Sequence, residues 1–224
     1  MPADSPRHLN LWKQQLGHTP ESVWQQTSLE SLVLADNQLT EISERIGEMK
    51  QLRMLDLGHN QISCLPEAIG QLEALSDFLY LHDNRLSSLP GSVERLKNLR
   101  YLNISDNQFT VLPDTVCKLD RLVELRVSGN QLTTVPDSID NLKHLRELHL
   151  RNNKLQTLPL STGQLRELRQ IDLRGNPIES LPETLASLPK LEKLDLRWVV
   201  SFARPAELPI WLSGLEDRGC LVYR

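Results

Sequence analysis

Few residues of the chain combine a reactive side chain with a spacing that could do chemistry. His59, His82 and Ser105 follow one another at intervals of 23 residues. Two histidines brought together could hold a metal ion, and a histidine beside a serine could form a hydrolytic pair. The sequence contains no GxxxxGKS/T, GxGxxG, HExxH, GxSxG or protein-kinase signature that would supply the rest of an active site.

Composition limits the classes of protein to which the chain can belong. Its 224 residues are 39% hydrophobic and 24% charged, which predicts a folded protein with a real core. The net charge of −4 and the pI of about 5.9 argue against nucleic-acid binding, because such proteins usually carry a basic face. No basic segment is followed by an apolar one near the start, and no run of eighteen apolar residues occurs, so neither export nor membrane insertion is expected.

The three cysteines, Cys64, Cys117 and Cys220, are far apart in the sequence and odd in number. They form no CxxC motif and no cluster, so a disulfide framework is not predicted. A reducing compartment fits best, and we expect the chain to be cytoplasmic.

Asparagines recur with a period that sets the organisation of the chain. Seven of them are separated by 23, 24, 23, 23, 23 and 23 residues. They are Asn37, Asn60, Asn84, Asn107, Asn130, Asn153 and Asn176. Around each, apolar residues return in the frame LxxLxLxxNxLxxLPxxIxxLxxL, and such self-similarity is the signature of a stacked repeat architecture.

Each unit of the frame predicts a short strand, a turn and a short helical segment. The LxL part alternates as a strand does, with the leucines inward and the intervening residues outward. The asparagine side chain can satisfy backbone groups inside the turn, so stacked copies would form an asparagine ladder. The proline of the LP pair fits the first position of a helical segment. One unit buries too little to fold alone, so the copies must stack.

This pattern resembles the leucine-rich repeat family, and its 23-residue LxxLP form is similar to the cytosolic Ras-group class. The resemblance implies an α/β solenoid, a curved right-handed horseshoe with parallel strands on the concave face and short helical or 3-10 segments on the convex face. The ending LPIWLSGLEDRGCLVYR resembles the tails of bacterial leucine-rich repeat proteins.

The resemblance covers nearly the whole chain, so we expect a single domain over 1–224. A degenerate unit and N-terminal cap occupy 1–28, seven regular repeats occupy 29–190, and a degenerate unit and C-terminal cap occupy 191–224. The aromatic and β-branched residues at the ends are interpreted as cap residues, with a docking site as the alternative for the WVVSF stretch. They are Trp12, Trp24, Trp198, Val199, Val200, Phe202 and Trp211.

The outward strand positions vary between units, so recognition should lie there. Several outward residues in the first half of the predicted sheet are aromatic. Those in the second half are mostly charged and include four arginines. We predict that a partner binds at Met54, Phe78, Tyr80, His82, Tyr101, Arg126, His149, Arg151, Arg174 and Arg197. Aromatic residues and Met are enriched at the centres of protein interfaces. The charged half has an equally weighted alternative, a solvated face whose Glu and Arg residues neutralise each other across strands.

One unit departs from the common length. An extra residue between Leu75 and Leu79 produces the single spacing of 24. It indicates either a bulge that re-aims Phe78 and Tyr80 or an insertion tolerated in a loop.

These observations favour a protein-binding scaffold or adaptor that uses its concave face and is not an enzyme. An open sheet face offers no closed pocket, no oxyanion donors and no third metal ligand, so we expect no catalytic residue, cofactor or metal. The resemblance implies protein partners, among them small GTPases and signalling enzymes, and the chain alone is expected to be monomeric. The alternative is a substrate-recognition module of a larger signalling, ubiquitin-ligase or host-directed effector system whose catalytic part lies elsewhere.

Overall fold

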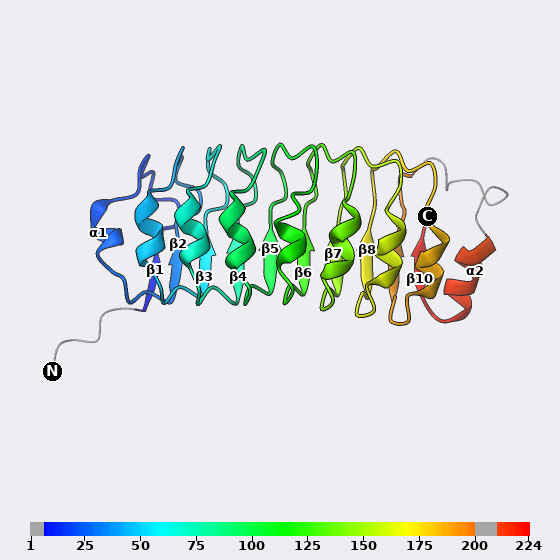
Figure 1. Cartoon of the computed structure of the whole chain (residues 1–224). Helices are drawn as coiled ribbons and strands as arrows, with labels where there is room; N and C mark the ends of the chain where they lie inside the picture. Colours follow the sequence, from blue (N-terminus) through cyan, green and yellow to red (C-terminus); the bar gives the residue numbers. More distant parts are fainter. Residues whose placement is uncertain (1–6, 200–209) are drawn as a thin grey trace.

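A single parallel sheet runs through the molecule, which the computed structural model describes over residues 7–199 and 210–224. Its strands lie side by side in the order in which they occur in the chain (Figure 1). They are β1 (His8–Asn10), β2 (Ser31–Val33), β3 (Met54–Asp56), β4 (Phe78–Tyr80), β5 (Tyr101–Asn103), β6 (Glu124–Arg126), β7 (Glu147–His149), β8 (Gln170–Asp172), β9 (Lys193–Asp195) and β10 (Leu221–Tyr223).

Short helices form the second layer. The 3-10 helices are η1 (Glu44–Glu48), η2 (Glu67–Gln71), η3 (Gly91–Arg95), η4 (Val116–Lys118), η5 (Asp137–Asn141), η6 (Leu160–Gln164) and η7 (Glu183–Ser187). The α-helices are α1 (Glu21–Trp24) and α2 (Ile210–Asp217). No helix in the described ranges has the length and apolar character needed to cross a bilayer.

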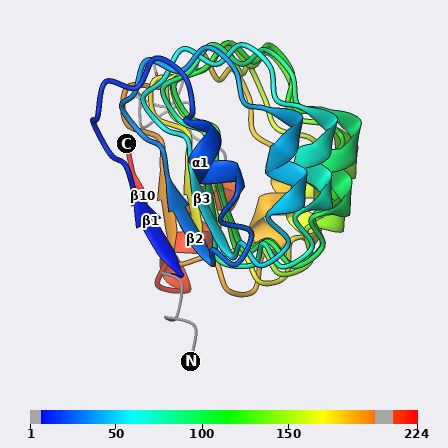
Figure 2. The same ribbon diagram turned by 90° about the vertical axis from the view of Figure 1, so that its left-hand side faces the viewer.

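The strands and the helices line opposite sides of the stack of coils. Viewed along the stack, the middle coils project further toward the helix side than the coils at either end, so the strand side is the concave one (Figure 2). This arrangement confirms the expected α/β solenoid. The middle residue of each strand points inward, and from Leu32 to Leu194 these residues are fully buried.

The asparagine of each regular unit lies in the turn after its strand and bonds to the coil before it. Asn107 is typical: Nδ2 donates to the carbonyls of Ile104 and Ser105 in its own coil and of Leu81 in the preceding coil, at 2.9–3.2 Å. Its Oδ1 accepts from the N–H of Leu86 at 2.9 Å. The side chain is buried, so it replaces water for the N–H of Leu86, which would otherwise be unpaired, and supplies a further donor to the three carbonyls.

The residue immediately before each of these asparagines adopts a left-handed conformation. The positions are Asp36, His59, Asp83, Asp106, Gly129, Asn152 and Gly175, and Trp198 occupies the equivalent place before Val199. Asp, Asn, His and Gly tolerate a positive φ, whereas a bulky residue such as Trp198, at φ 64°, is an outlier there.

Five prolines of the repeat frame lie one residue earlier than expected, and Pro113 lies further ahead of its helix, η4. Pro66, Pro90, Pro136, Pro159 and Pro182 are N-cap residues with φ between −62° and −70° and extended ψ, and each helix begins at the next residue. The fixed φ of proline suits this extended position as well as it suits a first helical position.

The extra residue of the fourth coil is absorbed before the strand. β4 pairs with β3 in the same register as its neighbours, with Met54 opposite Phe78 and Asp56 opposite Tyr80. Just before β4, the N–H groups of Ser76 and Asp77 both donate to the carbonyl of Arg53. Two residues therefore oppose one just before β4, and Phe78 and Tyr80 stay in phase with the outward residues of the neighbouring strands.

The ends of the solenoid are closed in part as expected. Trp24 and Val199 are buried, and Trp211 packs against the core. Trp12 and Trp198 do not fill the cap role predicted for them, because 55% and 65% of their surfaces are exposed. Val200 and Phe202 lie outside the described residues. The C-terminal end is covered by Leu212 and Leu215 of α2 and by β10, a strand that the repeat frame did not predict.

Candidate functional site

The strand face carries the side chains that the sequence predicted for recognition. Residues at positions i, i+2 and i+4 of an extended segment share one face, so each coil presents its two outward strand residues and one residue just beyond the strand. Met54, Phe78, Tyr80, Tyr101, Arg126 and His149 lie within strands, and His82, Arg151, Arg174 and Arg197 follow two residues after a strand ends.

Phe78, Tyr80 and Tyr101 form a cluster that we call the aromatic patch. The ring of Phe78 is stacked on that of Tyr80 at 5.6 Å and meets that of Tyr101 edge-on at 5.3 Å. The centroids of Tyr80 and Tyr101 are 5.1 Å apart. Phe78 is 41% exposed, although a ring of this size is usually buried. The patch therefore offers apolar surface to solvent at the centre of the concave face.

Tyr101 is partly buried within the aromatic patch. Burial raises the pKa of the Tyr101 hydroxyl to about 12, against the lowering effect of the Arg126 charge. The guanidinium of Arg126 lies 6.0 Å from the Tyr101 ring centroid. Met54 stands opposite Phe78 in the β3–β4 pair, so it extends the apolar surface by one strand.

Three of the four arginines of the second half are paired with a carboxylate two residues earlier in the same strand segment. Arg126 donates to Glu124, Arg174 to Asp172, and Arg197 to Asp195. Asp172 and Asp195 are only 5% and 1% exposed, so they lie beneath the guanidinium groups that neutralise them. The predicted neutralisation of this half occurs chiefly within strands, although Arg174 also reaches Asp195 on the next strand at 3.5 Å.

Arg151 is the exception in this row. The position two residues before it is occupied by His149, where its neighbours have an aspartate or a glutamate. Within the described residues Arg151 forms no ion pair, and its buried Nε has no hydrogen-bond partner. The exposed ring of Trp198 lies 5.6 Å from the Arg151 guanidinium and 5.9 Å from that of Arg174. Arg151 and Trp198 thus form a cationic and aromatic pair. Arg151 also lines a shallow hollow on the strand face, together with Arg126 and Arg174.

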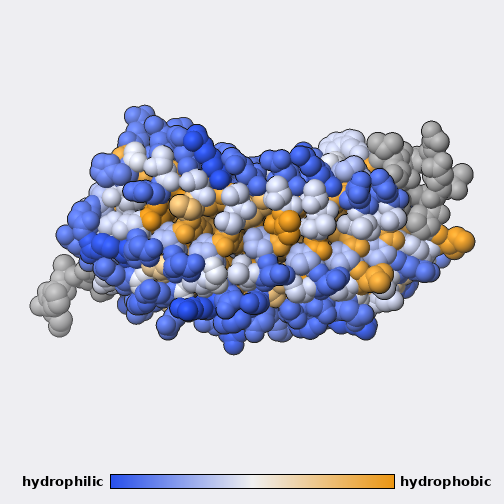
Figure 3. Space-filling model, turned by 45° about the horizontal axis from the view of Figure 1, so that its top comes forward, coloured by the Kyte–Doolittle hydropathy of each residue, from blue (hydrophilic) through white to orange (hydrophobic). Residues whose placement is uncertain are grey.

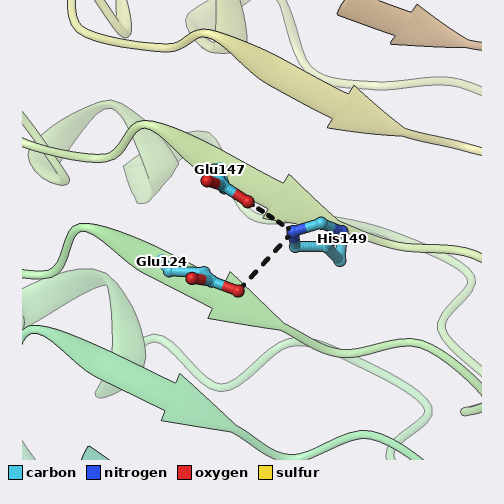
Figure 4. A group of neighbouring side chains, drawn as sticks. All are labelled: Glu124, Glu147 and His149. Carbon is cyan, nitrogen blue, oxygen red and sulfur yellow. Dashed lines mark hydrogen bonds and ion pairs between the residues drawn. The ribbon is translucent and has the colours of Figure 1, made fainter.

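His149 joins two glutamates in a group that sequence reasoning missed (Figure 4). Its Nε2 lies 3.1 Å from Oε2 of Glu147 on the same strand and 3.7 Å from Oε1 of Glu124 on the neighbouring strand. The three ligand atoms could hold a cation. The Nε of Arg126 already donates to the same Glu124 oxygen, which weighs against a second cation there. The alternation of Glu and His in the columns could have revealed this group.

His59 and His82 approach each other as the 23-residue spacing suggested. Their Nε2 atoms are 3.2 Å apart. The pKa of His82 is lowered first by burial and then by His59, against the charges of Asp56, Asp83 and Asp106. No hydrogen bond within the described part of the chain joins His82 to Ser105, so the hydrolytic pair imagined from the sequence is not assembled.

On the flank where the strands end, hydrophobic side chains gather in a broken band between hydrophilic margins (Figure 3). The band follows the length of the solenoid, and this flank shows no broad apolar area.

Parallel strands stacked in chain order, an asparagine ladder and an open concave face define a class of protein, the solenoid of short repeats. The chain belongs to the leucine-rich repeat family. The family model described as "Leucine rich repeat" matches residues 7–62, 27–86, 120–178 and 143–198, and the model described as "Leucine-rich repeat region" matches residues 77–148. No curated protein matches the chain in sequence.

Solved structures of other leucine-rich repeat proteins are similar to this chain. A Leptospira interrogans LRR protein, LIC12759, is 27% identical with a TM-score of 0.78, over 96% of this chain and 65% of that one. The plant peptide hormone receptor RGFR1, solved in complex with RGF2, is 34% identical with a TM-score of 0.71, over 80% of this chain and 30% of that one.

The LRR ectodomain of the Arabidopsis thaliana membrane receptor kinase GASSHO1/SCHENGEN3, solved in complex with CASPARIAN STRIP INTEGRITY FACTOR 2, is 28% identical. Its TM-score is 0.62, over 80% of this chain and 25% of that one. The chain therefore spans about two thirds of the bacterial protein and less than a third of either plant receptor. Leucine-rich repeats serve as protein-interaction modules, typically without catalysis.

Proposed function

We propose that this chain is a non-catalytic recognition protein that binds a protein partner on its concave strand face, with the aromatic patch as the centre of the interface. The proposal rests on the mutual contact of the Phe78, Tyr80 and Tyr101 rings on the strand face. The fold needs only strands and inward leucines there, so it does not itself require aromatic side chains. Aromatic residues at the centre of an interface commonly supply most of its binding free energy.

The charged half supports the same proposal through a single side chain. Arg174 and Arg197 are held by buried aspartates, so they contribute structure and little free charge. Arg151 has no such partner within the described residues. We expect Arg151, backed by Trp198, to bind an acidic side chain of the partner, because a guanidinium pairs well with a carboxylate.

The cellular role that we propose is that of a cytoplasmic adaptor in signalling, acting as a single domain. The three thiols are free, and Cys64 is exposed, which suits a reducing compartment. The 23-residue LxxLP spacing supports the Ras-group class, for which small GTPases and signalling enzymes are the expected partners. The likeness to the Leptospira interrogans protein over 96% of the chain supports a bacterial origin.

The test is affinity capture with the full chain and with a Phe78→Ala/Tyr80→Ala/Tyr101→Ala variant, followed by titration of each captured protein in purified form. We expect the variant to lose at least about 2 kcal/mol of binding free energy, or about thirtyfold in affinity. The matched control is Val111→Ala/Leu160→Ala, which removes exposed apolar side chains outside the strand face. Equal affinities of the aromatic variant and the wild type, with the fold intact, would contradict the proposal.

A further inference from the structure

The imidazoles of His59 and His82 approach each other through their Nε2 atoms, between two neighbouring coils. The Nε2 atoms are 3.2 Å apart, the ring centroids are 4.6 Å apart and the rings are nearly perpendicular, at 82°. His59 follows β3 and His82 follows β4, so the two side chains bridge adjacent units of the sheet. Two nitrogens bound to one tetrahedral Zn²⁺ ion, each at about 2.0–2.1 Å, would lie about 3.3 Å apart. The separation in this chain already matches that value.

We propose that His59 and His82 bind one divalent transition-metal ion through their Nε2 atoms, with Zn²⁺ as the ion that suits them. Imidazole is a preferred ligand of Zn²⁺, Cu²⁺ and Ni²⁺. The site requires no rearrangement of the backbone, because the two Nε2 atoms already lie 3.2 Å apart. Water or a side chain of a bound partner would complete the coordination, since the side chain of His59 is 52% exposed.

Asp83 fixes the chemical state of one ligand. Its Oδ2 lies 2.7 Å from Nδ1 of His59. A carboxylate can only accept, so Nδ1 carries the proton and the lone pair of Nε2 points toward His82. A metal-binding histidine commonly has such a carboxylate behind it, which orients the ring and raises its basicity. Nδ1 of His82 has no hydrogen-bond partner within the described part of the chain, so it can take up the proton that leaves Nε2.

The charges around the histidines favour a cation. Asp56, Asp83 and Asp106 all act on His82 through their negative charge. The alternative cluster of Glu124, Glu147 and His149 has a third ligand, but Arg126 is bonded to Glu124 there. A metal ion at that cluster would have to displace or face a guanidinium. From the sequence we expected no metal, because a third protein ligand is missing. At His59 and His82, water or a side chain of a bound partner would take that place.

Gly58 is the residue that leaves room for the His82 ring. A Cβ at position 58 would lie 2.4 Å from Cε1 and 2.9 Å from Nε2 of His82. The backbone of Gly58 has no positive φ, so an alanine there is strained only by the ring. Gly58→Ala should therefore push the imidazole aside and leave the coil in place. This makes Gly58 a positioning residue for the proposed site.

The test is calorimetric titration of the full, untagged chain with ZnCl₂ at neutral pH. We expect wild type to bind one equivalent, and His59→Gln and His82→Gln each to lose that binding. The matched controls are His144→Gln, which removes an exposed histidine of another coil, and His149→Gln, which removes the alternative cluster. Both controls should bind Zn²⁺ as wild type does, and circular dichroism should show an unchanged fold in all four variants.

Two further variants test the geometry. Asp83→Asn should weaken Zn²⁺ binding by about 10- to 100-fold, because the outer-shell carboxylate is lost. Gly58→Ala should weaken it by a similar factor while both histidines remain. Absorption of the Co²⁺ form would report directly on nitrogen coordination in each variant. The proposal is overturned if wild type fails to bind, if His59→Gln binds as tightly as wild type, or if His149→Gln loses the ion in its place.

Discussion

Arg197 donates hydrogen bonds to both carboxylate oxygens of Asp195, with Nε 2.9 Å from Oδ1 and Nη2 2.8 Å from Oδ2. Asp195 is only 1% exposed, and Nε of Arg174, from the neighbouring strand segment, lies 3.5 Å from its Oδ2. Arg197 in turn lies 5.3 Å from the ring of Tyr223 in β10. The last coils are thus joined by a series of charged and aromatic contacts, which the repeating pattern of apolar residues does not predict.

The pairing of Asp195 predicts how stability changes in acid. Burial raises its pKa, but the hydrogen bonds from Arg197 and the charge of Arg174 outweigh burial and leave the pKa below its ordinary value. A lowered folded-state pKa stabilises the native state above the unfolded-state pKa, and this contribution is lost as the pH falls through the folded-state value. Asp195→Asn should therefore be less stable than wild type at pH 7. The difference between their free energies of unfolding should become smaller below about pH 4.

Urea unfolding at several pH values measures that gap. Asp217→Asn is the control, because Asp217 is an exposed acidic residue of α2 at the same end of the chain. A gap between wild type and Asp195→Asn that stays constant from pH 7 to pH 3 would contradict the assigned role of the carboxylate.

Replacing one residue of the asparagine ladder should destabilise the whole array. Asn107→Ala leaves the buried N–H of Leu86 unpaired. It also removes one donor from each of three carbonyls, which keep their bonds to Asn130, Asp83 and Asn84. Each buried polar group left unpaired costs about 1–3 kcal/mol, so we expect a loss of more than about 2 kcal/mol in the free energy of unfolding. Gln108→Ala, at the exposed next position, should change it by less than about 0.5 kcal/mol. Chemical denaturation of both variants checks this, and equal losses would argue against the ladder.

Replacing Trp198 should separate recognition from stability. Its left-handed conformation costs a residue with a side chain about 1–2 kcal/mol, which glycine would recover. The lost contact with Arg151 is worth about 0.5–1 kcal/mol. We expect the free energy of unfolding of Trp198→Gly to stay within about 1 kcal/mol of wild type, while its affinity for a protein partner falls. Trp198→Asn should behave alike, and a large loss of stability in both would place Trp198 in the packing of the cap.

The three thiols should differ sharply in reactivity. Cys64 is exposed, whereas Cys117 and Cys220 are buried. Burial raises the pKa of the Cys117 thiol to about 11, against a hydrogen bond with Ser138 that lowers it, and burial also raises the pKa of Cys220. Since the thiolate is the reactive form, one thiol per native chain should react quickly with Ellman's reagent at pH 8 and three after unfolding. Cys64→Ser should abolish the fast phase, and a fast phase that survives would show that a buried thiol is accessible.

The sequence by itself determined the solenoid. The spacing of its leucines and asparagines fixes which residues turn inward, and a repeat protein is built from contacts within a unit and with its neighbours. The same columns placed Phe78, Tyr80 and Tyr101 together on one face, because neighbouring strands of a sheet are only about 4.8 Å apart. They also brought His59 close to His82.

Only the tertiary structure decided how these side chains pair. The columns did not reveal that Asp172 and Asp195 lie buried beneath arginines, that His149 leaves Arg151 without a carboxylate, or that Trp12 and Trp198 stay exposed. The physical reason is that the apolar frame is set by the backbone period, whereas the direction of an outward side chain depends on its rotamer and on whichever charges and rings its neighbours supply. The distance between the Nε2 atoms of His59 and His82 likewise depends on side-chain rotamers, so only the tertiary structure could give it.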